Sequence, residues 1–144
     1  MTIRPATIQD LSTILKIENL SFSSPWTETH FRYELKDNPY AFVLVAEAEG
    51  YVIGYIDFWI TFQQAQINNL AVIPTLRRQG IGNVILRDAI NRIIQSGCES
   101  ITLEVRVSNL IAQKLYGKYG FKALIKKPHY YADGEDALLM EKRL

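Results

Sequence analysis

Residues 69–83 constrain the fold most, because they join an apolar strand to a glycine-containing turn that opens a long helix. Gly80 and Gly82 let the backbone approach a ligand closely, and the first N–H groups of a helix have no partner within it. The helix dipole favours an anion at this end. Arg77 and Arg78 oppose that dipole unless an anion lies between them. The turn therefore predicts a binding site for a pyrophosphate group.

Two other phosphate-binding motifs fit this turn poorly. A Walker loop ends in Gly-Lys-Ser/Thr, and no lysine follows Gly80 or Gly82. A dinucleotide-binding fingerprint needs a third glycine or an alanine where this chain has Ile85, although Glu104 does lie about twenty residues further on. The remaining alternative is an ordinary helix start with two flexible glycines and no ligand.

The flanking sequence predicts an α+β domain with a strand, loop, helix and strand at its centre. Thr7 and Asp10 form an N-cap pattern for the first helix, and Thr27 can cap a second one after the break at Pro25. Strands are expected at 2–5, 41–47, 51–61, 66–72, 100–107, 121–126 and 137–142, and helices at 8–20, 80–96 and 110–119, with a short helix after Thr27 that carries Phe31 and Leu35 on one face. Gly97 and Gly120 are expected to end the last two helices.

The length of 144 residues fits one domain over residues 1–144, and 48% hydrophobic residues suffice for a core without metals or disulfides. Cys98 is the only cysteine, which favours a reducing compartment. His30 and His129 lie far apart in the sequence, so no metal site is expected. The N-terminus lacks the apolar region of a signal peptide, and no apolar run reaches the ~20 residues of a membrane span. We therefore expect a cytoplasmic protein that does not bind membranes.

The charge is unevenly distributed along the chain. Residues 1–72 carry 4 Lys/Arg and 8 Asp/Glu, a net charge of −4, whereas residues 73–144 carry 12 and 7, a net charge of +5. This asymmetry suggests an anionic partner for the second half and a cationic one for the first. The alternative is two solvated faces of unequal sign. Because acids offset the basic residues, no strong basic stripe forms and no nucleic-acid partner is expected.

The pattern Arg-x-x-Gly-x-Gly at Arg77, Gly80 and Gly82, after the strand end Leu70-Ala71-Val72, resembles the acetyl-CoA signature of the GNAT acetyltransferase superfamily. The resemblance extends to the RimI branch, the bacterial ribosomal-protein-alanine N-acetyltransferases, and covers nearly the whole chain. Its further segments are 22–26, Glu104-Val105-Arg106-Val107-Ser108-Asn109, Leu115-Tyr116, Tyr119-Gly120-Phe121 and Tyr130-Tyr131 with Glu135-Asp136-Ala137. This resemblance implies a mixed central sheet of about six to seven strands flanked by about four helices.

The resemblance also implies acetyl-CoA as co-substrate and assigns residues to it. The backbone of Leu70, Ala71 and Val72 would hold the pantetheine arm, and Asn109 would contact that arm. The pyrophosphate would be held by Arg78, Gln79, Gly80, Ile81, Gly82 and Asn83. RimI proteins often show Gln-Arg-Arg where this chain has Arg-Arg-Gln at 77–79, so which arginine contacts phosphate stays open.

Two side chains match the catalytic positions of that family. Glu104 lies in an apolar strand, and burial disfavours the charged form of a carboxylate, so it is a candidate general base. A carboxylate on the solvent side of the strand, or paired to Arg106, is the alternative. Tyr116 is the candidate acid, because a phenol with an ordinary pKa near ~10 is protonated at neutral pH. The family's oxyanion contact falls on the backbone N–H of Val72.

Cys98 has no histidine near it in sequence, so no covalent intermediate is expected on it. Direct attack by the amine in a ternary complex is the preferred mechanism. The presence of both Glu104 and Tyr116 argues against a non-catalytic acyl-CoA sensor.

Aromatic residues in or beside loops are suited to lining an acceptor groove. The candidates are Trp26, Phe31, Tyr33, Tyr130 and Tyr131, although core packing explains Trp26 and Phe31 about as well. The acids at 133–136 could hold a cationic peptide. The resemblance implies that the acceptor is the N-terminal alanine of the eighteenth small-subunit ribosomal protein, a basic protein. Alternatives are a small amine or antibiotic, other protein N-termini, or lysine side chains.

Overall fold

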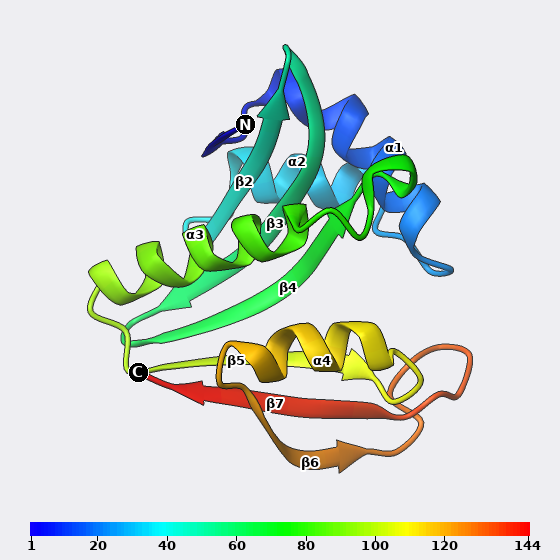
Figure 1. The fold of residues 1–144 in the computed structure, drawn as a ribbon, viewed down its shortest axis with the longest axis vertical. Coiled ribbons are helices and arrows are strands. Elements are labelled where there is room, and N and C mark those ends of the chain that lie inside the picture. The colour runs from blue at the N-terminus through cyan, green and yellow to red at the C-terminus, as the bar shows by residue number, and fades with distance from the viewer.

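The computed structural model describes residues 1–144, which form one mixed sheet of seven strands with helices on both faces (Figure 1). The strand order is β1-β2-β3-β4-β5-β7-β6. Neighbouring strands are antiparallel except for β4 and β5, which are parallel. The strands are β1 (Thr2–Pro5), β2 (Ala41–Ala48), β3 (Tyr51–Thr61), β4 (Gln64–Val72), β5 (Ser100–Arg106), β6 (Lys122–Lys127) and β7 (Ala137–Arg143). The predicted α+β class and the mixed sheet are confirmed.

Four α-helices accompany the sheet: α1 (Leu11–Ser21), α2 (Glu28–Lys36), α3 (Ile81–Gln95) and α4 (Leu110–Lys118). Short 3-10 turns precede α1 at Ile8–Asp10 and α3 at Pro74–Leu76. The Asp10 carboxylate accepts from the Thr7 N–H at 2.8 Å, and the Thr27 hydroxyl accepts from the His30 N–H at 3.2 Å. Both predicted caps are therefore present. The predicted element bounds hold to within three residues. None of the helices has the length and apolar character needed to cross a membrane.

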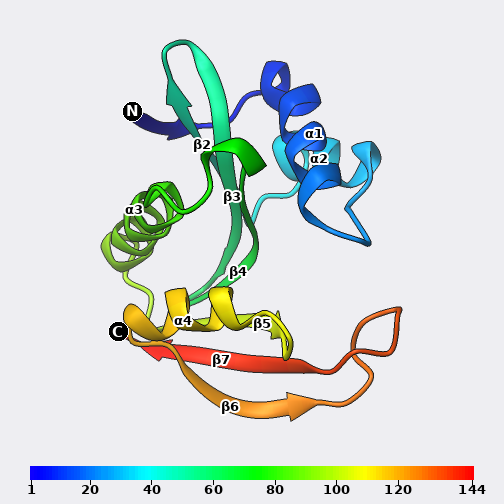
Figure 2. The same ribbon diagram turned by 45° about the vertical axis from the view of Figure 1, so that its right-hand side comes forward.

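The sheet separates two apolar cores, since α1 and α2 cover one face and α3 the other (Figure 2). The larger core joins α3 and α4 to the sheet and includes Ile56, Ile67, Ile85, Leu103 and Tyr116. The smaller core lies under α1 and α2 and includes Ile14, Ile17, Phe31, Val45 and Tyr55. With apolar side chains on both faces, the central strands are fixed in place by burial.

The parallel pair β4 and β5 is short, and this positions the site. Gln64 to Ile67 pair with Ser100 to Leu103, and beyond this point the two strands separate (Figure 1). The pairing of β3 with β4 shifts register between Asp57 and Phe58, which leaves Asn68 as an extra residue in β4. A bulge of this kind bends its strand. The C-terminal part of β4 therefore leaves β5 and opens a wedge between them.

Candidate active site

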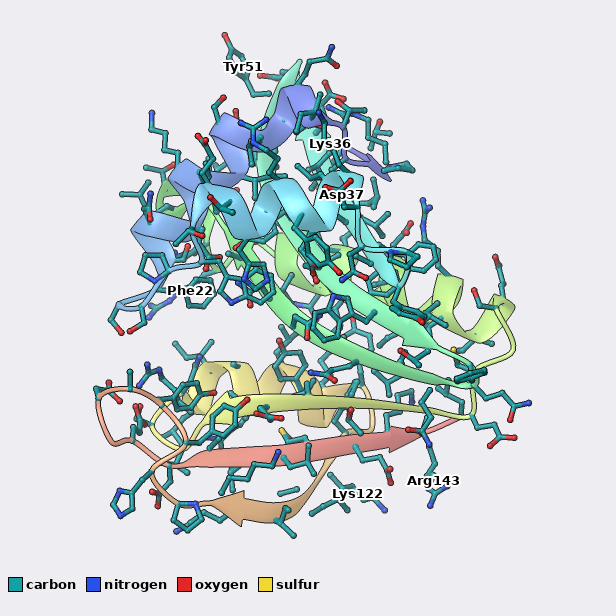
Figure 3. The ribbon with its side chains drawn as sticks, turned by 180° about the vertical axis from the view of Figure 1, so that it is seen from behind. Phe22, Lys36, Asp37, Tyr51, Lys122 and Arg143 are labelled. Atoms are coloured by element: carbon teal, nitrogen blue, oxygen red, sulfur yellow. The ribbon has the colours of Figure 1, made fainter.

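A cleft of about 690 Å³ occupies the wedge between β4 and β5. Five segments line it: the end of α1 with residues 21–26, β4 at 66–70, β5 at 104–106, α4, and the loop between β6 and β7. Phe22, labelled in Figure 3, lies at the end of α1 on the side that faces β5 and α4. The cleft brings together seven residues that the sequence singled out: Trp26, Leu70, Glu104, Asn109, Tyr116, Tyr130 and Tyr131. Phe31 and Tyr33 do not line it, because Phe31 is buried in the smaller core and Tyr33 is exposed on α2.

Glu104 presents its carboxylate to this cleft from the face of β5 opposite Leu103 and Val105. Its Oε1 accepts from Lys127 Nζ at 3.1 Å, whereas its Oε2 is buried without a hydrogen-bond partner. The alternative pairing with Arg106 is wrong, because Arg106 binds Asp133 and Glu135 instead. A buried carboxylate oxygen without a partner carries a free-energy cost, and a catalytic role is one of the reasons for which proteins retain such atoms.

Tyr116 lies on the α4 side of the same cleft, packed edge-on against Phe121 with ring centroids 5.7 Å apart. Burial, and to a lesser degree the neighbouring Tyr131, raises the pKa of Tyr116 above its ordinary value. The phenol therefore keeps its proton at any pH at which the protein is expected to work. Glu104 and Tyr116 thus place one proton acceptor and one proton donor on the same cleft.

The backbone of β4 offers free polar groups where it has left β5. Ile73 N–H bonds to Ile53 C=O at 2.8 Å, so alternate residues of β4 direct their polar groups toward β3. Ala71 is one of the residues whose N–H and C=O point toward β3. The N–H and C=O groups of Leu70 and Val72 point the other way, toward the opening. Because pairing with β5 ends at Ile67, the N–H groups of Leu70 and Val72 face the wedge unpaired by that strand.

The turn before α3 keeps its backbone donors free. Gly80 is the N-cap in the left-handed region, with φ +81°, and no side chain caps the helix. The first N–H groups of α3 therefore remain available to an external acceptor, which fits a pyrophosphate. Arg77 points elsewhere, since it donates to Val72 C=O at 3.0 Å and to Ser21 Oγ at 2.9 Å. Exposed Arg78 and Gln79 are the side chains left at the turn.

Two predicted cofactor residues have structural partners as well. Asn109 is the N-cap of α4, where its Oδ1 accepts from the Ala112 N–H at 3.1 Å. Asn83 accepts from Lys118 Nζ at 3.2 Å and from the Tyr119 hydroxyl at 3.3 Å, which ties α3 to α4. Ile81, Gly82 and Asn83 lie in the first turn of α3, next to the glycine turn. Asn109 lies at the start of α4 and lines the cleft.

The loop between β6 and β7 carries Tyr130 and Tyr131, whose rings meet edge to face with centroids 5.1 Å apart. The Arg106 guanidinium lies 4.1 Å from the centre of the Tyr131 ring and binds Asp133 at 2.8 Å and Glu135 at 2.9 Å. The adjacent Glu104 carboxylate raises the pKa of Tyr130 to about 12. The loop is thus braced against β5 beside the candidate base.

The loop acids, which were expected to be available to a cationic peptide, have partners within the chain. Glu135 accepts from Arg106 and also from the Ser108 N–H, and Asp136 accepts from the His129 N–H. Asp133 accepts from Arg106 and from the Glu135 N–H. The acids therefore hold the loop together through contacts within the chain, and this gives them a structural role besides any contact with a peptide.

Comparison with known proteins decides the family. A sequence profile described as the acetyltransferase (GNAT) family matches residues 11–121. The chain belongs to the GNAT acetyltransferase family. It is 42% identical, over 96% of its length and 92% of the relative, to a Bacillus subtilis protein provisionally named ribosomal protein bS18-alanine N-acetyltransferase. An N-alpha-acetyltransferase of Sulfurisphaera tokodaii is 37% identical over 96% of this chain and 90% of the relative.

The fold of this GNAT domain has a matching solved structure. The crystal structure of the ribosomal-protein-S18-alanine N-acetyltransferase from Escherichia coli superposes with a TM-score of 0.91 at 29% identity, covering 99% of this chain and 92% of that one. The predicted GNAT fold and the resemblance to the RimI branch are confirmed. The protein is an N-acetyltransferase, and acetyl-CoA is the acetyl donor of its family.

Three residues at or beside the GNAT cleft, Lys127, Arg106 and Glu18, were not among the predicted site residues. No local pattern selects Lys127 or Arg106, because their partners are 23 to 29 residues away: Glu104 in β5 for Lys127, and Asp133 and Glu135 in the loop between β6 and β7 for Arg106. Glu18 carried a signal that could have been used. It lies four residues after Ile14, on the buried face of α1, and a carboxylate on an apolar stripe needs partners.

Proposed function

We propose that the chain acetylates the N-terminal alanine of ribosomal protein bS18, with acetyl-CoA as donor. The observation that carries the proposal is the wedge itself, where the unpartnered Oε2 of Glu104 and the protonated Tyr116 line one cleft. Relatives named for this activity, at 42% identity and at a TM-score of 0.91, support the choice of acceptor.

The residues present fit acetyl-CoA at both ends. The uncapped N-terminus of α3, at Gly80 to Asn83, would hold the pyrophosphate through backbone N–H groups. The N–H groups of Leu70 and Val72, which β5 leaves unpaired, would hold the pantetheine arm. Asn109 and Arg78 lie where they can add side-chain contacts. When bound, acetyl-CoA supplies an acetyl group activated as a thioester.

Glu104 would take a proton from the acceptor amine as its nitrogen bonds to the acetyl carbon. The Val72 N–H would stabilise the negative charge that develops on the carbonyl oxygen. Tyr116 would donate its proton to the sulfur as the carbon–sulfur bond breaks, and the products are the N-acetylated peptide, in which the amine has become an amide, and a free thiol. Glu104 then loses its proton and Tyr116 regains one, so both groups return to their starting states.

An α-amine is an easier acceptor for this site than a lysine side chain. With pKa values near ~8 and ~10.4, roughly a tenth of N-terminal amines are neutral at pH 7, against a few lysines per ten thousand. A single carboxylate can therefore deprotonate an N-terminus without a second base. Trp26, Tyr130 and Tyr131 would line the path of the acceptor peptide.

The test is mass spectrometry of a peptide with the bS18 N-terminal sequence, incubated with acetyl-CoA and the protein. We expect one added acetyl group on the α-amine. The same peptide with a blocked N-terminus and an internal lysine should remain unmodified. An unmodified bS18 peptide, with acetyl transfer to polyamines or aminoglycosides instead, would overturn the proposal in favour of a small-amine acceptor.

A second candidate is a broader N-terminal acetyltransferase, because the Sulfurisphaera tokodaii relative is named only as an N-alpha-acetyltransferase. A panel of peptides that begin with alanine, serine, methionine or glutamate separates the two. If the chain is specific for bS18, kcat/KM for its N-terminus exceeds that of the others by more than tenfold. Equal values across the panel would favour the broader activity.

A further inference from the structure

Glu18 is a buried carboxylate at the cleft to which the proposed reaction assigns no role. It lies near the end of α1, has only 1% of its surface exposed, and lines the cleft between Trp26 and Asn69. A carboxylate at this depth is stable only when its oxygens accept hydrogen bonds. Its partners therefore show what it holds in place.

Three segments donate to Glu18. The backbone N–H of Trp26 reaches Oε2 at 2.8 Å, and Asn69 Nδ2 reaches Oε1 at 2.8 Å and Oε2 at 3.1 Å. The Tyr55 hydroxyl also donates to Oε1. Burial, and then the Glu18 charge, raises the pKa of Tyr55, so this hydroxyl remains a donor. Both oxygens are occupied, in contrast to Glu104, so Glu18 is not placed to accept a proton from the acceptor amine.

The bond to Trp26 is the polar anchor of the loop between α1 and α2. Residues 23–26 make no other hydrogen bond to the rest of the chain. The Trp26 ring stacks on His30 at 3.9 Å and meets Phe31 at 5.3 Å, which holds the ring against α2 but does not tie it to the sheet. Within residues 23–26, the bond to Glu18 is the only hydrogen-bonded link toward β4, and Arg77 makes a second link just before the loop, from Val72 C=O to Ser21 Oγ.

The bond to Asn69 acts on the other side of the cleft. Asn69 follows the extra residue of the bulge and directly precedes Leu70, where β4 has separated from β5. Its side chain is held by Glu18, and the side chain of Asn68 is held by Asp57 at 3.0 Å. The carboxylate of Glu18 thus joins the bent part of β4 to the loop on the acceptor side.

We propose that Glu18 is a positioning residue that fixes the loop at 22–26 relative to the strand segment 70–72, and so sets how the acceptor peptide meets the thioester. The inference rests on the proposed function, because it assumes that this loop receives the acceptor. Glu34 provides a matched control. It is also a buried glutamate, with 4% of its surface exposed, and it accepts from Trp59 Nε1 and Asn38 Nδ2, both at 2.6 Å, away from the cleft lining.

The chain has two tryptophans, and each lies beside one of these glutamates. In protein labelled with 5-fluorotryptophan, Glu18→Gln should shift or broaden the fluorine resonance of Trp26 and leave that of Trp59 unchanged. Glu34→Gln should do the opposite. Gln at position 18 disrupts the network because its NH₂ group meets donors where a carboxylate oxygen accepted. An unchanged Trp26 resonance in Glu18→Gln would overturn the proposal, and this measurement needs no acceptor.

Kinetics then test the consequence for the reaction. Glu18→Gln should raise KM for the acceptor peptide about tenfold or more, with the Kd for acetyl-CoA within about twofold of wild type. Glu34→Gln should lower Tm but keep both values. Equal KM changes in the two variants would reduce Glu18 to a structural role and overturn the inference. If wild type acetylates no N-terminal peptide, the proposed function fails, and the fluorine spectra still decide the role of Glu18.

Discussion

Glu104 and Lys127 form an ion pair at 3.1 Å although their strands, β5 and β6, do not pair with each other. Lys127 reaches past β7 to hold Oε1, which leaves Oε2 as the free oxygen in the cleft. A carboxylate held at one oxygen and free at the other keeps its orientation while it exchanges a proton. This arrangement suits a general base better than a residue needed only for stability.

The first prediction concerns this free oxygen. Glu104→Gln retains an oxygen for Lys127 but cannot accept the amine proton, so kcat should fall by about 10²-fold or more. The Kd for acetyl-CoA, measured by calorimetry, should remain near that of wild type. Glu99→Gln is the matched control, since Glu99 is exposed just before β5 and should leave kcat unchanged. A Glu104→Gln enzyme as fast as wild type would remove Glu104 from the mechanism.

The sequence predicted the fold well because its signals were local. The strand at 51–61, rich in Val, Ile, Phe and Tyr, the cap at Thr27 and the glycine at 97 each depend on residues close in sequence. The site was less predictable where it depends on distant contacts. The bulge at Asn68, the turn of Arg77 toward Ser21, and the bracing of Tyr131 by Arg106 all depend on tertiary packing, and no local pattern encodes them.

The second prediction concerns the pH dependence of the acid. Because burial raises the pKa of Tyr116 in the folded protein, its phenol stays protonated beyond the ordinary value of about 10. The profile of kcat against pH should therefore show no descending limb from Tyr116 below about pH 10. Tyr116→Phe should lower kcat about tenfold or more at every pH tested. A fall in wild-type kcat near pH 8, absent in Tyr116→Phe, would show instead that the phenol ionises easily.

The third prediction concerns Arg106 as the brace of the loop with Tyr130 and Tyr131. Arg106→Met removes both carboxylate contacts and the cation over the Tyr131 ring. The loop should become more mobile, so KM for the acceptor peptide should rise about tenfold, whereas the Kd for acetyl-CoA should change little. Steady-state kinetics with each substrate varied in turn separates these effects.

Arg92 provides the control for the brace, because it is also ion-paired, to Asp88 at 2.6 Å, but lies on α3 outside the cleft. Arg92→Met should leave both substrate constants unchanged. If Arg106→Met also keeps the wild-type KM for the acceptor, the loop does not bind the acceptor in the way proposed.

The fourth prediction separates cofactor binding from folding at Gly82. A Cβ at this position would meet only Leu115 Cδ2, at 3.9 Å, so Gly82→Ala is compatible with the folded chain. Alanine favours a helix by about 1 kcal/mol over glycine, so Tm should be unchanged or higher. The Kd for acetyl-CoA should nevertheless rise about tenfold, because the methyl group blocks close approach of the pyrophosphate to the backbone.

Gly117 in α4 is the control for Gly82, since a Cβ there would meet nothing within 4 Å. Gly117→Ala should raise Tm in the same way and leave the Kd for acetyl-CoA unchanged. Wild-type affinity in Gly82→Ala would mean that the pyrophosphate does not lie against this part of the helix.

The fifth prediction concerns Asp57, which is fully buried in β3 with its Oδ2 unpartnered. Burial, and then the nearby charges of Glu34 and Glu18, raises the pKa of Asp57 to about 9. In the unfolded chain this carboxyl ionises near pH 4. The folded state therefore binds the proton more tightly, and the free energy of unfolding should fall as pH rises between about 4 and 9, by up to about 1.4 kcal/mol per pH unit.

Asp57→Asn tests this directly, because the amide resembles the protonated carboxyl and does not titrate. It can still accept from Asn68, as Asp57 does at 3.0 Å. In urea unfolding, the variant should match wild type near pH 4 and exceed its stability by about 1 kcal/mol or more at pH 8. Exposed Asp37 serves as the control, since Asp37→Asn should show no such trend. A difference between Asp57→Asn and wild type that stays constant from pH 4 to 8 would mean that Asp57 is already ionised in the folded protein, and that its neighbours Glu34 and Glu18 do not oppose its charge.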